Sequence, residues 1–162
     1  MTIEQTRTLP GVLLWNVSKL WQQQLNSALE EIGLSSTNAV ILSNMLHLEL
    51  EHQQANQGML AELSNVDLMT TSNALRTLQK KGFIDRNTDP HDKRAYILSL
   101  TTEGRHTAYQ ALRRIAHCHQ HFFGRLQDQE LAQFAGSLTK LLGTLKPDDS
   151  TSHDRTDGGS LG

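Results

Sequence analysis

The sequence predicts a mainly α-helical fold that carries a small β element of two or three strands. Apolar residues recur every three or four positions along most of the chain, whereas residues 83–100 hold two short strand-like runs on either side of a turn. At 162 residues and 37% hydrophobic content, the chain is long enough for one domain with one core. We expect that domain to cover residues 1–146, and the polar residues 147–162 to form a disordered tail.

Two helices are expected in the first third of the chain. The first covers about residues 9–32 and ends at Gly33, because glycine is favoured just after a helix. Its apolar stripe consists of Leu14, Val17, Trp21, Leu25 and Leu29. Ser35 or Ser36 can cap the second helix. The polar, aperiodic stretch EHQQANQG that follows it predicts a loop.

Two short helices joined by a tight turn come next. The stretch MLAELSNVDLMTTSNALRTLQKKG divides at SNVD, which is a poor helix interior and a good turn. Asp67 is expected to cap the second of these helices, which ends at Gly82. The side chains expected to face the core are Leu68, Leu75 and Leu78. Such a pair is a helix-turn-helix, whose second helix can lie in the major groove of DNA.

A β-hairpin is expected directly after this pair. FIDR and AYILSL are strand-like runs, and in the second Tyr96, Leu98 and Leu100 recur at every other position. Between the runs, NTDPHDK places a proline in the hairpin loop. A helix-turn-helix followed by a two-stranded hairpin is a winged helix, which we place at about residues 35–101.

The last two predicted helices point to self-association. Thr101 caps a helix that extends to about residue 127, and Asp128 caps a final one. The apolar stripe of the final helix is Leu131, Phe134, Leu138, Leu141, Leu142 and Leu145. A stripe this regular favours a homodimer built from the first helix and the last two, although a three-helix core within one chain would use the same residues.

The distribution of charge favours a nucleic-acid partner. The whole chain has a net charge of −2, yet residues 67–105 hold seven basic and five acidic side chains. A basic segment in an otherwise acidic chain suits a DNA-binding protein. A solvated charged face would give the same count.

Several classes of protein are disfavoured by what the sequence lacks. It has neither an apolar run of about 20 residues nor a signal peptide, so we expect a cytoplasmic protein with no membrane partner. Its single cysteine, Cys118, excludes an intramolecular disulfide. It contains no G-x-S-x-G, no glycine-rich phosphate loop and no H-E-x-x-H, and we therefore expect neither an enzyme nor a cofactor.

A motif of acids and bases fills the hairpin loop and reaches into the next helix. LQKKGFIDR followed by DPHDKRAYILSLTTEGR resembles the MarR family of bacterial transcription regulators, whose wing reads D-x-x-D-x-R and then L-T-x-x-G. The matching positions are Asp89, Asp92, Arg94, Leu100, Thr101 and Gly104. The resemblance covers roughly residues 35–125. The loop around Glu51–Gln57 is about four residues longer than the family suggests, and it either lengthens a helix or forms an excursion.

The resemblance implies a winged helix-turn-helix flanked by dimerisation helices at about residues 9–32 and 102–146. The implied function is sequence-specific transcriptional regulation, by a ligand-responsive repressor that binds double-stranded DNA at a pseudo-palindromic operator as a homodimer. It further implies that Arg94 enters the minor groove and that Asp92 holds it in place. A narrow A·T-rich minor groove does favour an inserted guanidinium.

The second helix of the helix-turn-helix supplies the candidates for reading bases. Asn73 can pair with adenine, Arg76 with guanine or phosphate, and the Thr70 methyl with thymine. Each can instead be an exposed helix residue that touches no base. The complete predicted DNA-binding set is Met69, Thr70, Ser72, Asn73, Arg76, Asp92, Lys93 and Arg94.

Family members commonly bind phenolic or other aromatic acids between the dimer base and the DNA-binding lobes. The residues of this sequence that can line such a space are Trp15, Trp21, Met45 and His47. Core packing accounts for the same residues equally well.

Two alternatives to a ligand-responsive repressor stay open. A winged helix can serve as a protein-interaction module, which has no need of Thr70, Asn73 and Arg94 in DNA-facing positions. The segment HCHQH can make a metal- or redox-responsive regulator that uses His117, Cys118 and His121. Where zinc-sensing relatives hold ligands, this chain has Val40, Ala111 and Ile115, so we expect no metal site.

Overall fold

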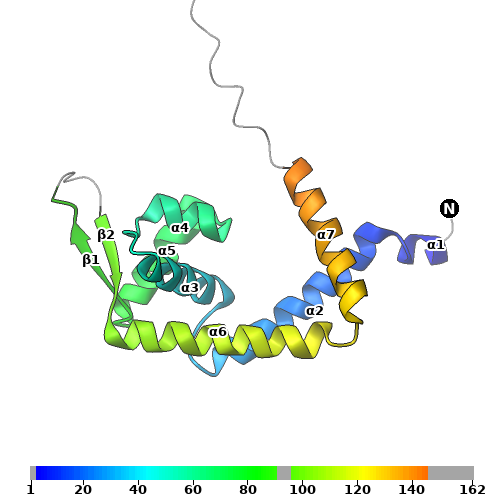
Figure 1. Cartoon of the computed structure of the whole chain (residues 1–162), viewed down its shortest axis with the longest axis horizontal. Helices are drawn as coiled ribbons and strands as arrows, with labels where there is room; N and C mark the ends of the chain where they lie inside the picture. The colour runs from blue at the N-terminus through cyan, green and yellow to red at the C-terminus, as the bar shows by residue number, and fades with distance from the viewer. Residues whose placement is uncertain (1–2, 91–95, 146–162) are drawn as a thin grey trace, which may run out of the picture. The chain divides into compact units, whose positions relative to one another are not determined.

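The computed structural model describes residues 3–90 and 96–145. Over these residues it has seven helices and one two-stranded antiparallel sheet (Figure 1). This confirms the prediction of a mainly α-helical fold with a small β element. The chain divides into two compact units, Met1–Phe122 and Phe123–Gly162, and each is described by itself. Within the described ranges, no helix combines the length and the apolar character needed to cross a membrane.

The first unit opens with α1 (Ile3–Arg7) and the long helix α2 (Pro10–Glu30), of which only α2 was predicted. Proline at the first position suits α2, because its missing N–H would have no partner there. Gly33 follows α2 with a φ of +69°, a left-handed conformation that glycine adopts without strain. In α3 (Ser36–Leu50), the Ser35 hydroxyl accepts from the Asn38 N–H at 3.2 Å, so Ser35 is the cap.

The helix-turn-helix consists of α4 (Gln57–Ser64) and α5 (Leu68–Lys80). Asn56 caps α4, and Asn65 ends it with a φ of +51°. The Asp67 carboxylate accepts from the Thr70 N–H at 2.8 Å and caps α5 as predicted. The prediction that Leu68 faces the core is wrong, because the first turn of α5 extends beyond the core and leaves that side chain exposed.

The core of the first unit lies where α2, α3, α4, α5, the hairpin and α6 meet. The two other leucines of α5 that were predicted to face the core, Leu75 and Leu78, are both buried. Thr71, rather than Leu68, fills the inward position of the first turn, and its hydroxyl donates to the Asp67 carbonyl at 2.9 Å. The side chains of the core with the least exposure include Leu29, Ile41, Leu42, Leu46, Leu60, Leu78 and Ala108.

The hairpin pairs β1 (Ile84–Thr88) with β2 (Tyr96–Leu100), and Ile84 lies opposite Leu100. Leu98 and Leu100 are buried, whereas Tyr96 is exposed. The long loop around Glu51–Gln57 was predicted either to lengthen a helix or to form an excursion, and both occur. Helix α3 continues to Leu50, and an irregular segment follows it. In that segment, Ala55 forms a single antiparallel bridge to Leu98, which adds one paired residue beside the two-stranded sheet.

Helix α6 (Thr102–Phe123) begins at the predicted cap and ends about four residues earlier than expected. The Thr101 hydroxyl accepts from the Gly104 N–H at 2.9 Å and donates to the Gly82 carbonyl at 2.7 Å. The cap therefore also fixes the end of α5 next to the start of α6. Because Thr101 also directly follows β2, this one residue links the ends of α5 and β2 to the start of α6.

The second unit contains α7 (Asp128–Leu145). Asp128 is the first residue of this helix, so the prediction that it serves as the cap is wrong. The Glu130 carboxylate accepts from the Gln127 N–H at 2.8 Å and satisfies a donor that the start of the helix leaves unpaired. Phe123 and Phe134 pack with ring centroids 6.3 Å apart. The predicted tail, residues 147–162, lies outside the described residues.

Candidate nucleic-acid interface

The five residues predicted to read bases lie on one face of α5. Met69, Thr70, Asn73 and Arg76 are exposed and Ser72 is half-buried. The other face of the helix is buried through Thr71, Ala74, Leu75 and Leu78. Since a helix turns by 3.6 residues, these two sets fall on opposite sides. The packing of α5 thus presents the predicted set to solvent as one surface.

The start of α5 is held by a carboxylate whose two oxygens are both engaged. Asp67 Oδ1 accepts from the Thr70 N–H at 2.8 Å, and Asp67 Oδ2 accepts from the Thr70 hydroxyl at 2.7 Å. These bonds, the hydroxyl's first, lower the pKa of the Asp67 carboxyl below its ordinary value. The ionised carboxylate also complements the positive end of the helix dipole. The Thr70 hydroxyl proton is therefore already used within the protein.

Further along the same face, Arg76 Nη1 donates to Asn73 Oδ1 at 3.2 Å. This bond leaves the Asn73 amide nitrogen to donate outward. The start of α5 is also tied to α4, because Gln57 Nε2 donates to the Leu68 carbonyl at 3.3 Å. No local pattern in the sequence predicts this second contact, since the two residues lie on different helices.

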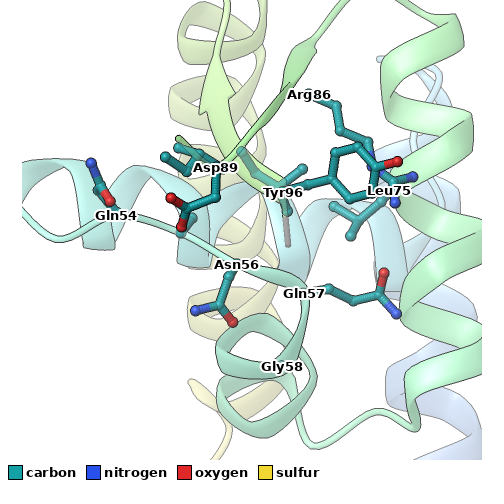
Figure 2. Close-up of a pocket in the computed structure, with 11 residues that line it drawn as sticks. Gln54, Asn56, Gln57, Gly58, Leu75, Arg86, Asp89 and Tyr96 are labelled. Atoms are coloured by element: carbon teal, nitrogen blue, oxygen red, sulfur yellow. The ribbon is translucent and has the colours of Figure 1, made fainter. Parts of the chain in front are cut away.

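The tip of the wing lies outside the described residues, and with it Asp92, Lys93 and Arg94. The base of the wing is described. Across the hairpin, the Arg86 guanidinium lies 3.8 Å from the centroid of the Tyr96 ring, within the range of a cation–π contact (Figure 2). We did not predict a role for Arg86. The available signal was a basic residue and an aromatic residue on the two strands of a predicted hairpin. In the observed register Arg86 lies opposite Leu98 and Tyr96 lies opposite Thr88, so the contact is a diagonal one.

A cavity of about 340 Å³ opens beside this pair (Figure 2). The hairpin contributes Arg86, Asp89 and Tyr96, and the start of α4 contributes Asn56 and Gln57. Leu75 of α5 also lines it. The cavity thus joins the wing base to the helix-turn-helix, with a guanidinium and amide groups at its edge.

A bidentate ion pair connects α3 to α6. Arg105 Nε and Nη2 donate to the two carboxylate oxygens of Glu49 at 2.6 Å and 2.9 Å. The hydrogen bond from Arg105 lowers the pKa of Glu49. Elsewhere in the same unit, Lys81 Nζ donates to the Gly33 carbonyl at 2.6 Å and ties the end of α5 to the turn before α3. Asn44 donates to the Ser64 hydroxyl at 3.0 Å and joins α3 to α4.

The four residues predicted to contact an effector occupy different environments. Trp15 is exposed on α2, and Trp21 is half-buried with its ring 5.4 Å from that of Phe122. Met45 is buried in the core, whereas His47, two positions along α3, is exposed. A cavity of about 220 Å³ is lined by Met45 but by none of the other three.

The HCHQH segment places its members on different faces of α6. Cys118 is buried, and His117 and His121 are exposed. In the portion of the chain that the structure describes, no three or more His, Cys, Asp or Glu side chains are grouped so that they could hold a metal ion.

Comparison with known proteins agrees with this geometry. The sequence pattern of the MarR family matches residues 45–96. An uncharacterized HTH-type transcriptional regulator of Bacillus subtilis (strain 168), YdcH, is 36% identical over 135 residues, which cover 83% of this chain and 90% of that protein.

Two solved structures have the same fold. One is a mutant of MarR from E. coli in complex with operator DNA, with a TM-score of 0.74 and 23% identity over 88% of this chain and 99% of that one. The other is the MepR–DNA complex of S. aureus, with a TM-score of 0.76 and 24% identity over 84% of this chain and 98% of that one.

Proposed function

Since this chain belongs to the MarR family of transcriptional regulators, we propose that it represses its target genes by binding a pseudo-palindromic DNA operator as a homodimer. The observation that carries the proposal is the exposed face of α5, which presents Asn73 and Arg76 on the second helix of a helix-turn-helix beside a hairpin. The structures of MarR with operator DNA and of MepR with DNA, which share the fold, support the same partner.

In this proposal α5 lies in the major groove. Asn73 pairs with an adenine through its amide, and Arg76 contacts a guanine or a phosphate. Arg94, braced by Asp92, enters the minor groove, where negative potential is concentrated in A·T-rich sequence. Lys93 contacts the phosphate backbone. Base contacts then set the sequence preference, and phosphate contacts set register and affinity.

The second part of the proposal is the homodimer. In α7, Leu141 and Leu142 are exposed, and in α2 Leu13, Leu14 and Trp15 are exposed. Apolar side chains gathered on helices in this way favour burial against another chain. A two-fold dimer presents two reading helices to successive major grooves, about one DNA turn apart, and therefore requires a pseudo-palindromic site.

We further propose that a small aromatic or phenolic compound relieves repression, with Trp15, Trp21, Met45 and His47 as the first residues to test. The support for this part is the family, together with the half-buried Trp21 beside Phe122. We place the protein in the cytoplasm, where its DNA target lies, and assign it no catalytic role.

The alternative is a winged helix that binds another protein. It has no use for an exposed asparagine and arginine joined by a hydrogen bond on α5. Substitutions there would then leave DNA binding unchanged and weaken a protein complex instead.

Selection of bound fragments from a random DNA pool tests the proposal. The wild type should recover a sequence with two related half-sites. Arg94→Ala should weaken binding to that sequence by roughly 1–3 kcal/mol. Asp92→Ala should give a smaller loss, because it removes only a bracing hydrogen bond. Arg113→Ala, which removes an exposed arginine from α6, is the matched control and should bind as the wild type does. Recovery of no sequence, or wild-type affinity of Arg94→Ala, would contradict the proposal.

A further inference from the structure

Two large apolar side chains are exposed at the start of the reading helix. Leu68 is 59% exposed and Met69 is 76% exposed. They are the first two residues of α5, immediately after the cap Asp67. The core does not use them, because Thr71 fills the inward position of this turn. Both lie at the N-terminal end of the second helix of the helix-turn-helix, the end whose residues contact base edges in this motif. An apolar pair held in water there calls for a partner with apolar groups.

We propose that Leu68 and Met69 read the C5-methyl groups of thymines in the major groove, and so set an A·T preference at the base pairs under the first turn of α5. The inference rests on the proposed function, because it takes α5 to be the helix in the groove. It adds a chemical class of target to that function, a methylated pyrimidine, and names Leu68 as a reading residue.

The hydrogen bonds of this turn leave its side chains without a free donor for reading a base. Leucine and methionine side chains have no hydrogen-bond donor. The Thr70 hydroxyl, the third candidate, already donates to Asp67 Oδ2 at 2.7 Å. Both carboxylate oxygens of Asp67 already accept hydrogen bonds from Thr70. What the turn offers a base is therefore mainly apolar surface.

The charge at this position directs the turn toward base edges rather than the DNA backbone. Asp67 is ionised, since its hydrogen bonds from Thr70 favour the charged form. A carboxylate repels phosphates, so the start of α5 is poorly suited to contact the backbone, although a bare helix N-terminus would attract it. Among the groups exposed in the major groove, the thymine methyl is the apolar one.

The turn is also held rigidly enough to select a position. Its backbone is fixed before Leu68 by the Asp67 cap and after it by the hydrogen bond from Gln57 to the Leu68 carbonyl at 3.3 Å. Preorganisation of this kind lowers the entropy lost when the side chains are buried against DNA. Leu68 and Met69 therefore approach defined base pairs.

The test replaces thymine by deoxyuridine, which removes only the methyl group. A duplex selected by the wild type from the random pool is synthesised with one deoxyuridine at a time in each half-site, and dissociation constants are measured at one fixed salt concentration. For the wild type, at least one such position per half-site should weaken binding by roughly three- to tenfold, as expected for the loss of one buried methyl group. Leu68→Ala and Met69→Gln should reduce this discrimination, each at its own position.

Leu50→Ala is the matched control, because Leu50 is also 59% exposed but lies at the end of α3. It should discriminate thymine from deoxyuridine as the wild type does. Equal wild-type affinity for all deoxyuridine duplexes would overturn the inference while leaving the proposed function intact. The inference would also be overturned if both Leu68→Ala and Met69→Gln discriminated thymine from deoxyuridine as fully as the wild type does. Failure of the wild type to select any sequence would overturn the proposed function, and this inference with it.

Discussion

Arg76 donates a hydrogen bond to the side-chain oxygen of Asn73, one turn earlier on α5, over 3.2 Å. Asparagine reads adenine by donating from its amide nitrogen and accepting at its oxygen. The arginine thus fixes which end of the Asn73 amide is free to donate. Two residues that we had assigned to separate base contacts form one unit.

The first prediction is that Asn73→Ala relaxes the sequence preference at one base pair per half-site. Affinity for a scrambled duplex should stay nearly the same, because base contacts specify and phosphate contacts mainly position. Each good base contact is worth about 1–3 kcal/mol of discrimination. Binding of the wild type and the variant to all four bases at each position of the operator measures this effect.

Because the two residues are joined, Arg76→Ala should also lower the preference at the base pair that Asn73 reads. A double-mutant cycle should give a coupling energy of about 0.5 kcal/mol or more. Ser72→Ala, on the same face but outside this hydrogen bond, serves as control. Strict additivity of Asn73→Ala and Arg76→Ala would show that the residues act independently.

The second prediction concerns Gly104, at the start of α6. A Cβ atom there would lie 1.7 Å from the Phe83 carbonyl oxygen, which already accepts from the Thr101 N–H at 3.1 Å. That oxygen belongs to the backbone of the residue just before β1 and is bonded to the residue just before α6, so the clash is not relieved by a side-chain rotation. Gly104→Ala should lower the free energy of unfolding by about 3 kcal/mol or more, measured by urea denaturation.

Gly136→Ala is the control for this change. Gly136 also lies inside a helix, but a Cβ atom there meets nothing within 4 Å in its own chain. Since alanine is favoured over glycine in helices, this variant should be unchanged or more stable by up to about 1 kcal/mol. A Gly104→Ala protein as stable as the wild type would mean that α6 does not start against Phe83.

These contacts show what the sequence could predict and what it could not. Caps act over three residues, so Asp67 and Thr101 were identified from local spacing. For the second predicted helix the spacing left Ser35 and Ser36 open, and the hydrogen bond from the Asn38 N–H decides for Ser35. The period of apolar residues similarly predicted α2, α3, α6 and α7. Asp128 was misassigned because Glu130 reaches back to the backbone and makes an aspartate cap unnecessary.

The rest depends on elements that are distant in sequence. Leu68 has the spacing of an inward residue relative to Leu75, but periodicity does not tell where the neighbouring helices stop, and the side chain is exposed. Glu49 and Arg105 are 56 positions apart and meet only after α3 and α6 pack. The contact of Arg86 with Tyr96 needs the hairpin register. The exposure of the predicted face of α5 agrees with the sequence-based expectation, whereas the hydrogen bonds that orient its side chains could not be predicted.

The third prediction uses the ion pair between Glu49 and Arg105. The pKa of Glu49 is lowered in the folded protein by the hydrogen bond from Arg105. A lowered carboxyl pKa contributes stability that is fully present above the unfolded value, about 4.3, and is lost as the pH falls through the folded value. Glu49→Gln should therefore lower the melting temperature at pH 7, and the difference from the wild type should shrink progressively as the pH falls below the unfolded value.

The size of this effect should be small, because the two side chains are 37% and 40% exposed and solvent screens their attraction. The difference should shrink further in about 1 M salt. Glu51→Gln, which takes part in neither ion pair found in the described ranges, is the control and should show no such convergence. A pH-independent gap between Glu49→Gln and the wild type would assign the loss to packing instead.

The fourth prediction is that the protein is a dimer whose association and folding are linked. Leu138 is half-buried in the apolar stripe of α7, between the exposed Leu141 and the half-buried Phe134. Leu138→Glu would place a charge where we expect the partner to pack, and burial of an unpaired charge is costly. At micromolar concentration the wild type should sediment at twice the 18.1 kDa chain mass, and the variant as a monomer with a lower melting temperature.

Lys140→Glu changes the charge of the same helix by more, at an exposed position two residues along, and should remain dimeric and stable. A wild type that sediments as a single 18.1 kDa species would contradict the dimer, and with it the spacing of two half-sites in the operator.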